Sequence, residues 1–264
     1  MFGKKKDKNK LGIFGEKKEV LEANVSHIEK REKQILEDIA QVEENTDQIV
    51  ENATLNVSTE IALIQTLEEL TQEQAKAYGD YMAFCENVIS QMTAGAELVD
   101  QNKHFTSPSK YLSEVPTVLR AKNKKYENCL SEINEANFKE QIQVLRAEIT
   151  ESYKDIQELE NTIHHLVSLL TESNKAATKL VMKFTGYEKL VKNTSMRDFS
   201  EDLAEIRDEV MGLRNTDEEI AKCGERSKLQ MEDIEEEMQA IKQEIAEIES
   251  DISYLFDIAE QKAE

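Results

Sequence analysis

A repeat of apolar residues at alternate steps of three and four is the feature that most constrains this chain. From Ile142 to Val191, thirteen of the fifteen positions reached by these steps are apolar or aromatic, and from Leu203 to Ala259 fourteen of seventeen are. A weaker repeat with the same step runs from Leu21 to Phe105. A period of 3.5 residues is typical of α-helices that wrap around one another. The pattern predicts an all-α fold: an elongated antiparallel helical hairpin or coiled-coil bundle.

The composition agrees with this fold class. The 264 residues include only two prolines and eight glycines, whereas β-sandwiches and barrels depend on frequent glycine and proline turns. The stretch from Leu203 to Ala259 would form a helix about 85 Å long. A helix of that length must pack along its whole length against partners of similar length.

Three segments interrupt the repeat. Residues 102–117 contain both prolines, residues 192–200 form a polar break, and near 134–141 the frame slips, which fits either a turn or a continuous helix. We therefore expect helices over about 19–104, 117–192 and 200–262, with kinks at 102–117 and 192–200. Ser200 precedes Glu201 and Asp202, a pattern that predicts an N-cap at this serine.

Charge divides the chain into two domains. Residues 1–18 hold seven lysines and two acids, a net +5, so residues 19–264 carry a net −26 for the chain to total −21. We expect 1–18 to be a disordered basic leader and 19–264 to be one elongated coiled-coil domain. The leader either is a solvated terminus or makes weak contact with an anionic membrane surface. The lysines of that contact would be Lys4, Lys5, Lys6, Lys8 and Lys10.

The same numbers exclude several classes of protein. The acidic body repels nucleic acid phosphates, and no apolar run approaches the roughly 20 residues of a membrane-spanning helix. Cys85, Cys129 and Cys223 are far apart and lack metal-site or disulfide spacing. A cytoplasmic protein fits these features best.

No pattern of residues predicts an enzyme. His164 and His165 are adjacent, so on a helix they point about 100° apart and are badly placed to chelate one metal. Glutamate-rich stretches fit a solvated helix face better than an acid/base pair, which would need a pocket. We expect no catalytic residue, no metal and no cofactor.

The apolar positions of the repeat are candidates for packing and self-association, as a homodimer or higher oligomer. The strongest candidates are Ile156, Ile163, Leu166, Leu170, Ile234, Ile241, Ile245, Ile248, Ile252 and Leu255. Polar residues interrupt the repeat, and they either fix register and oligomeric state at a cost in stability or are merely tolerated. They are Glu32, Thr46, Asn56, Ser152, Ser173, Asp217 and Ser227.

Some segments resemble short, membrane-free chemoreceptor-like proteins, relatives of the methyl-accepting chemotaxis proteins. They are KHFT followed by SPSKYLSEVP from Lys103 to Pro116, IHHLVSLL from Ile163 to Leu170, and FSED from Phe199 to Asp202. The resemblance implies a cytoplasmic helical hairpin that acts in chemotactic signal transduction. In that family an Ala- and Asn-rich hairpin tip contacts the histidine kinase and its adaptor. This chain has ENCLSEINEANFKEQ there instead, so the kinase-contacting motif is missing.

Two functions follow. The first is a non-enzymatic cytoplasmic interaction protein, either a chemoreceptor-like signalling component or a scaffold without the tip, which pairs with itself or with other coiled-coil signalling proteins. The alternative is a membrane-surface coiled-coil scaffold that the basic segment anchors.

Overall fold

The structure is a computed structural model that describes residues 7–76, 80–101, 112–133, 138–194 and 197–261. Side chains of 7–32, 35, 36 and 256–261 also lie outside the description. The described residues form five helices: α1 (Asp7–Lys76), α2 (Tyr81–Gln101), α4 (Val115–Glu132), α5 (Lys139–Asn193) and α6 (Ser200–Gln261). No strand occurs among them, which confirms the predicted all-α helical bundle. None of these helices contains a stretch long and apolar enough to cross a membrane.

The chain divides into two units, Met1–Gln41 and Val42–Glu264. The first unit is described from Asp7 onward and consists of the N-terminal part of α1. The sequence had placed a boundary after residue 18 and had treated the preceding segment as disordered. Helix α1 instead begins at Asp7, inside that segment, because lysine and leucine are good helix formers and no proline interrupts them.

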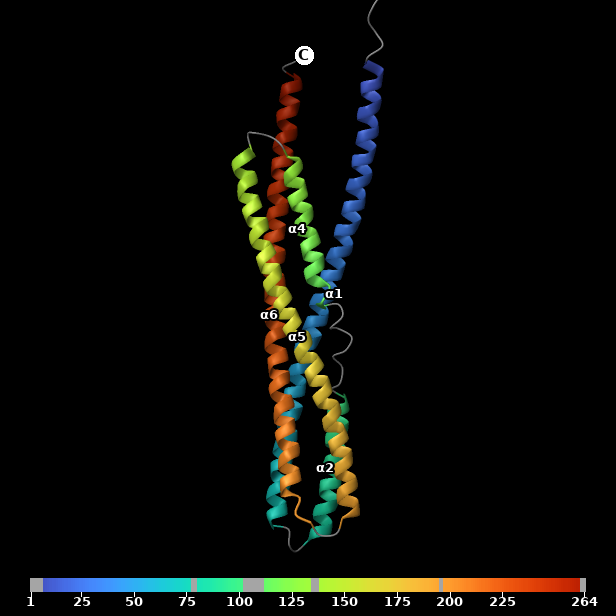
Figure 1. The fold of residues 1–264 in the computed structure, drawn as a ribbon, viewed down its shortest axis with the longest axis vertical. Helices are drawn as coiled ribbons and strands as arrows, with labels where there is room; N and C mark the ends of the chain where they lie inside the picture. The colour runs from blue at the N-terminus through green and yellow to red at the C-terminus, as the bar shows by residue number, and fades with distance from the viewer. Residues whose placement is uncertain (1–6, 77–79, 102–111, 134–137, 195–196, 262–264) are drawn as a thin grey trace, which may run out of the picture. The chain divides into compact units, whose positions relative to one another are not determined.

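In the second unit, α5 and α6 pack against each other in an antiparallel pair (Figure 1). Helix α2 packs on the C-terminal part of α5, where Gly95 faces Phe184. Helix α4 packs on the N-terminal part of α5, where Asn123 Nδ2 donates to the Ile149 carbonyl at 3.3 Å. Helices α2 and α4 are thus two consecutive pieces of one layer, and both run antiparallel to α5 (Figure 1).

The sequence analysis missed the break between α1 and α2. A single helix was expected over 19–104, but α1 ends at Lys76 and α2 begins at Tyr81. Gly79 is a poor helix former and Asp80 is a residue type that favours helix starts, so the chain can turn here. Steps of three and four from Leu70 reach Tyr81 and Phe84 without a slip, so the apolar frame gives no sign of the turn.

The helix expected over 117–192 is two helices. Helix α4 ends at Glu132 and α5 begins at Lys139, so the segment near 134–141 separates two antiparallel helices rather than continuing one. Residues 134–137 themselves lie outside the described residues. Pro116 lies in the first turn of α4, where its missing N–H leaves no helical hydrogen bond unmade. Most of the kink expected at 102–117 lies outside the description.

Helix α6 begins at Ser200, but this serine does not cap it. The Asp198 carboxylate accepts hydrogen bonds from both the Ser200 N–H at 2.9 Å and the Ser200 hydroxyl at 2.7 Å. These two bonds hold the pKa of Asp198 below its usual value. The cap therefore comes from the aspartate two residues earlier, which can satisfy a backbone N–H with a full negative charge.

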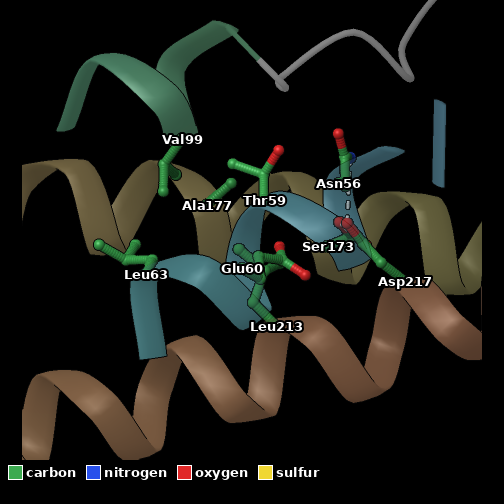
Figure 2. Close-up of a pocket in the computed structure, with 9 residues that line it drawn as sticks. All are labelled: Asn56, Thr59, Glu60, Leu63, Val99, Ser173, Ala177, Leu213 and Asp217. Atoms are coloured by element: carbon green, nitrogen blue, oxygen red, sulfur yellow. Dashed lines mark hydrogen bonds between the residues drawn. The ribbon is translucent and has the colours of Figure 1, made fainter. Parts of the chain in front are cut away.

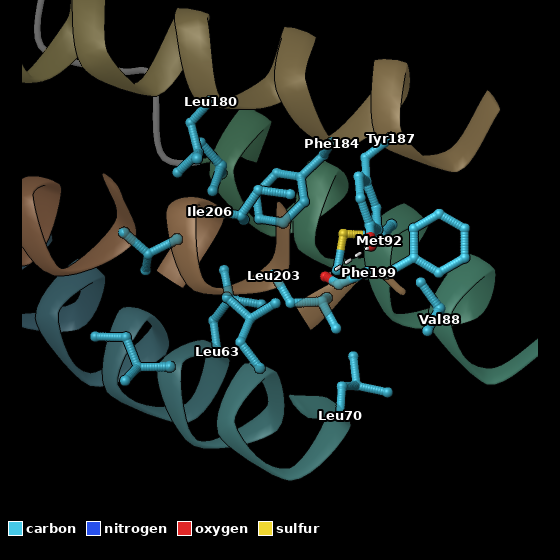
Figure 3. Packing of buried hydrophobic residues seen from close by; sticks show 14 of the residues in the cluster. Leu63, Leu70, Val88, Met92, Leu180, Phe184, Tyr187, Phe199, Leu203 and Ile206 are labelled. Atoms are coloured by element: carbon cyan, nitrogen blue, oxygen red, sulfur yellow. Dashed lines mark hydrogen bonds between the residues drawn. The ribbon is translucent and has the colours of Figure 1, made fainter. Parts of the chain in front are cut away.

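The apolar core of the second unit lies where α1, α2, α5 and α6 meet (Figure 3). Phe184 and Phe199 are fully buried, and the Tyr187 ring meets the Phe199 ring edge-on with centroids 5.6 Å apart. The Tyr187 hydroxyl donates to the Phe199 carbonyl at 3.4 Å, and the same carbonyl accepts the first hydrogen bond of α6 from the Leu203 N–H at 3.0 Å. These contacts tie the end of α5 to the start of α6.

Candidate functional site

The five lysines of the basic segment have no described side chains. Lys4, Lys5 and Lys6 lie outside the described residues. Lys8 and Lys10 lie on α1, but their side chains are also outside the description. Contact between these five lysines and an anionic surface therefore stays a prediction.

The predicted packing residues are mostly buried within the chain itself. All fifteen positions of the repeat from Ile142 to Val191 are buried on α5. On α6, the candidates up to Ile248 are buried, Ile252 is half-buried and Leu255 is 45% exposed. The candidates concerned are Ile156, Ile163, Leu166 and Leu170 on α5, and Ile234, Ile241, Ile245 and Ile248 on α6. Their contact with a second copy stays a prediction.

Polar residues from three helices meet inside the bundle, and we call Asn56, Glu60, Ser173 and Asp217 the polar layer. Asn56 Nδ2 of α1 donates to Asp217 Oδ2 of α6 at 3.1 Å. Ser173 Oγ of α5 donates to Asp217 Oδ1 at 2.6 Å. All four residues are at most 3% exposed. The layer therefore connects α1, α5 and α6 through the two oxygens of one buried carboxyl group.

Glu60 is the least satisfied member of the polar layer. It is 3% exposed, and its Oε2 atom is buried with no hydrogen-bond partner. Burial, together with the nearby charge of Asp217, raises the pKa of Glu60 to about 9. Burial also raises the pKa of Asp217, although the bonds from Ser173 and Asn56 oppose that rise. At neutral pH Glu60 therefore carries a proton unless another cation replaces it.

Two further charges lie beside Glu60, both on α6. The Arg214 guanidinium favours the ionised form of Glu60, and the Glu218 carboxylate opposes it. Arg214 Nε lies 3.5 Å from Glu218 Oε1, one helical turn away. Because Arg214 shares its charge with Glu218, it compensates only part of the negative charge in the polar layer.

A small cavity lies against the polar layer (Figure 2). Its volume of about 10 Å³ is close to what one water molecule needs. Polar side chains line one part and apolar side chains the rest. The lining residues are Asn56, Thr59, Glu60, Leu63, Val99, Ser173, Ala177, Leu213 and Asp217.

The other polar residues of the repeat behave differently. Thr46 Oγ1 donates to the Val42 carbonyl and Ser227 Oγ to the Cys223 carbonyl, both one turn back on the same helix. Ser152 Oγ is buried without a hydrogen-bond partner. The side chain of Glu32 is outside the description. The hydroxyl groups of Thr46 and Ser227 thus form hydrogen bonds within their own helices and do not connect two helices.

The sequence analysis singled out three residues of the polar layer, but it did not predict that they lie together. Asn56, Ser173 and Asp217 stood out as polar interruptions, and Glu60 also breaks the repeat. What brings them together is the antiparallel alignment of the helices, which also places Lys228 Nζ 2.7 Å from Asp47 Oδ1. The repeat within one helix does not determine that alignment.

Metal-binding side chains do not cluster. In the part of the chain that the structure describes, no group of three or more histidine, cysteine, aspartate or glutamate residues is placed to hold a metal ion. His164 and His165 are both exposed on α5, and the three cysteines are free.

Comparison with known proteins adds no function: no protein-family model, no curated protein and no solved structure matches the chain.

Proposed function

We propose that this chain is a non-enzymatic cytoplasmic interaction protein, a helical bundle that pairs with itself or with other coiled-coil proteins. The observation that carries the proposal is the bonding of Asn56 and Ser173 to Asp217 within otherwise apolar packing. Polar residues at such positions select one register and one set of partners at a cost in stability. A bundle whose task was stability alone would gain from apolar residues there.

The size of the cavity supports an interaction role over catalysis. Sites for organic ligands commonly have volumes of about 300–1,000 Å³. The cavity beside the polar layer has about 10 Å³ and leaves no room for such a substrate. The buried carboxyl groups of Glu60 and Asp217 thus face a space for about one water molecule.

The polar layer can be tested by replacing its hydrogen-bonding side chains together. A variant with Asn56→Leu, Ser173→Ala and Asp217→Leu should stay folded with an unchanged or higher thermal midpoint, because well-packed apolar residues often replace buried polar groups without loss. Because the layer lies within one chain, the variant should lose a single register of α1 against α5 and α6, which would appear as doubled or broadened amide signals in NMR spectra. One sharp set of signals for both wild type and variant would contradict the proposed role.

The signalling part of the proposal rests on the resemblance to chemoreceptor-like proteins. Long antiparallel helices support it, and the segment between α4 and α5 stands where that family has its tip. This segment lacks the small residues of the tip, so we expect mixing into receptor assemblies without direct control of the kinase. Adding the purified chain to a reconstituted receptor, adaptor and kinase tests this. Saturable adaptor binding that changes in 134–141 abolish would show a working tip.

The alternative is a scaffold on a membrane surface. It is supported by the start of α1 at Asp7, since this places Lys8 and Lys10 on a helix that also carries Leu11 and Phe14. Basic helices with apolar residues can lie on anionic lipid. Flotation with phosphatidylserine vesicles, with and without residues 1–18, separates the two functions. If the full chain floats with the vesicles and the chain without residues 1–18 does not, the result favours the alternative.

A further inference from the structure

The outward side of α1 carries an uncharged stretch in a strongly acidic chain. Of the sixteen residues from Asn52 to Leu67, only Glu60 is charged, and its side chain is buried in the polar layer. In the whole chain 33% of the residues are charged, with a net charge of −21. Steps of three and four mark one exposed stripe on this part of α1. Its residues are Leu55, Ser58, Ala62 and Gln65.

Helix α2 extends this uncharged surface. Asn87 Nδ2 of α2 donates to Glu73 Oε2 of α1 at 3.0 Å, which shows the side of α2 that faces α1. A Cβ atom placed on Gly95 would lie 3.2 Å from Leu63 Cδ1, so α2 also lies beside α1 at this level. Steps of four and three from Asn87 reach two exposed, uncharged residues, Ala94 and Leu98. We call Leu55, Ser58, Ala62, Gln65, Ala94 and Leu98 the neutral face.

The neutral face can be covered at low cost. Ser58 Oγ donates to the Thr54 carbonyl at 3.2 Å, and the neighbouring Thr54 Oγ1 donates to the Val50 carbonyl at 2.8 Å. Because both hydroxyl groups already bond within α1, a partner that covers them leaves neither donor unpaired. Leu55 is 60% exposed and Leu98 is 38% exposed. Burial of these side chains removes apolar area from water and so favours association.

We propose that the neutral face binds the neutral face of a second copy of this chain, in a two-fold symmetric contact. In such a contact a surface meets itself, so a charged face repels its copy and an uncharged face does not. The net charge of −21 opposes close approach of two copies through acidic faces. Anionic lipid and nucleic acid attract lysine and arginine, and the six residues of the neutral face include neither. The inference rests on the self-pairing in the proposed function and names the surface that it uses.

The size and charge of the contact predict how it behaves. From Leu55 to Gln65 the helix advances only about 15 Å. The contact should therefore bury less than the roughly 800 Å² per partner of a stable complex, and we expect a weak, reversible dimer. Salt screens the repulsion between two acidic chains, so the dissociation constant should fall as the salt concentration rises. A contact held by ion pairs would respond in the opposite way.

Sedimentation equilibrium at low and high sodium chloride concentration tests the proposal with two matched variants. All chains carry Leu255→Glu, so that association through the exposed end of the α6 repeat does not hide the contact. Ala62→Glu should raise the dissociation constant about tenfold or more, because each dimer would bury two carboxylates. Ala176→Glu places the same side chain at an exposed position of α5, outside the neutral face, and should leave the dissociation constant nearly unchanged. Circular dichroism checks that both variants keep their helices.

Three results would overturn this inference. They are a Leu255→Glu chain that stays monomeric at both salt concentrations, a dissociation constant that rises with salt, and equal dissociation constants for Ala62→Glu and Ala176→Glu. Self-association of the wild-type chain is measured separately. If the wild-type chain associates while the neutral face fails these tests, the proposed self-pairing stands and uses another surface.

Discussion

Gly224 of α6 lies directly against Val50 of α1: a Cβ atom placed on Gly224 would fall 2.7 Å from Cγ2 of Val50. Real Cβ atoms essentially never come this close to another heavy atom, so something must shift. Valine is branched at Cβ and stiff about χ1, which makes that shift costly. The glycine therefore allows the close approach of two helices at this level of the bundle.

Gly224→Ala should be destabilising relative to a matched control on the same helix. A Cβ placed on Gly212 has nothing within 4 Å, so Gly212→Ala should raise stability by about 0.5–1 kcal/mol through helix propensity. At Gly224 the same gain is opposed by about 1–3 kcal/mol of overpacking. Urea denaturation of both variants measures the difference.

The close contact can be removed from the other side. In a Val50→Ala background the Cγ atoms are gone, so Gly224→Ala and Gly212→Ala should have similar effects on the free energy of unfolding. A Gly224→Ala penalty that persists unchanged in this background would assign the cost to another neighbour.

Glu60 should make the bundle less stable as the pH rises. Its pKa is about 9 in the folded state against the ordinary glutamate value of 4.5, so between these values the folded state holds a proton that the unfolded state lacks. The contribution of Glu60 to stability is therefore full below about pH 4.5 and falls up to about pH 9, by at most roughly 1.4 kcal/mol per pH unit.

In the Glu60→Gln variant the side chain at this position is an amide, which does not lose a proton as the pH rises. The free energy of unfolding of this variant should exceed that of wild type by a margin that grows from pH 5 to pH 9. Glu69→Gln, an exposed carboxylate on the same helix α1, serves as the control for removing one negative charge. Parallel pH curves for wild type and Glu60→Gln would show that Glu60 is ionised in the folded protein.

The sequence predicted the helices well and the polar layer poorly, for a physical reason. Burial on α5 follows the 3.5-residue repeat because each helix has one face to cover, and that face is a local property of the sequence. The meeting of Asn56 with Asp217 depends on which residues of two distant helices lie at the same level. The repeat runs without a slip from α1 into α2, so it does not indicate that level. The pKa of Glu60 likewise depends on its burial, which no single helix determines.

Ile245 and Ser227 should respond in opposite ways to alanine. Ile245 is 5% exposed, and Ile245→Ala should cost about 2–5 kcal/mol through lost contacts and a cavity. Ser227 donates only to the Cys223 carbonyl of its own helix, so Ser227→Ala should be close to neutral or stabilising. Thermal midpoints of the two variants measure this. Equal changes would mean that the C-terminal part of α6 is not packed as the structure shows.

The exposed end of the α6 repeat should mediate self-association. Burial along this helix declines from Ile248, which is 5% exposed, to Leu255, which is 45% exposed, although the apolar repeat continues. We expect sedimentation equilibrium to give a species larger than the 30.2 kDa monomer, most simply a dimer.

Leu255→Glu should weaken association, because it would bring a charge into an apolar contact between two copies. Glu249→Gln, on the exposed face nearby, should leave the dissociation constant unchanged. A wild-type chain that stays at 30.2 kDa across the accessible concentrations would contradict self-association, and equal dissociation constants for wild type and Leu255→Glu would place the contact elsewhere.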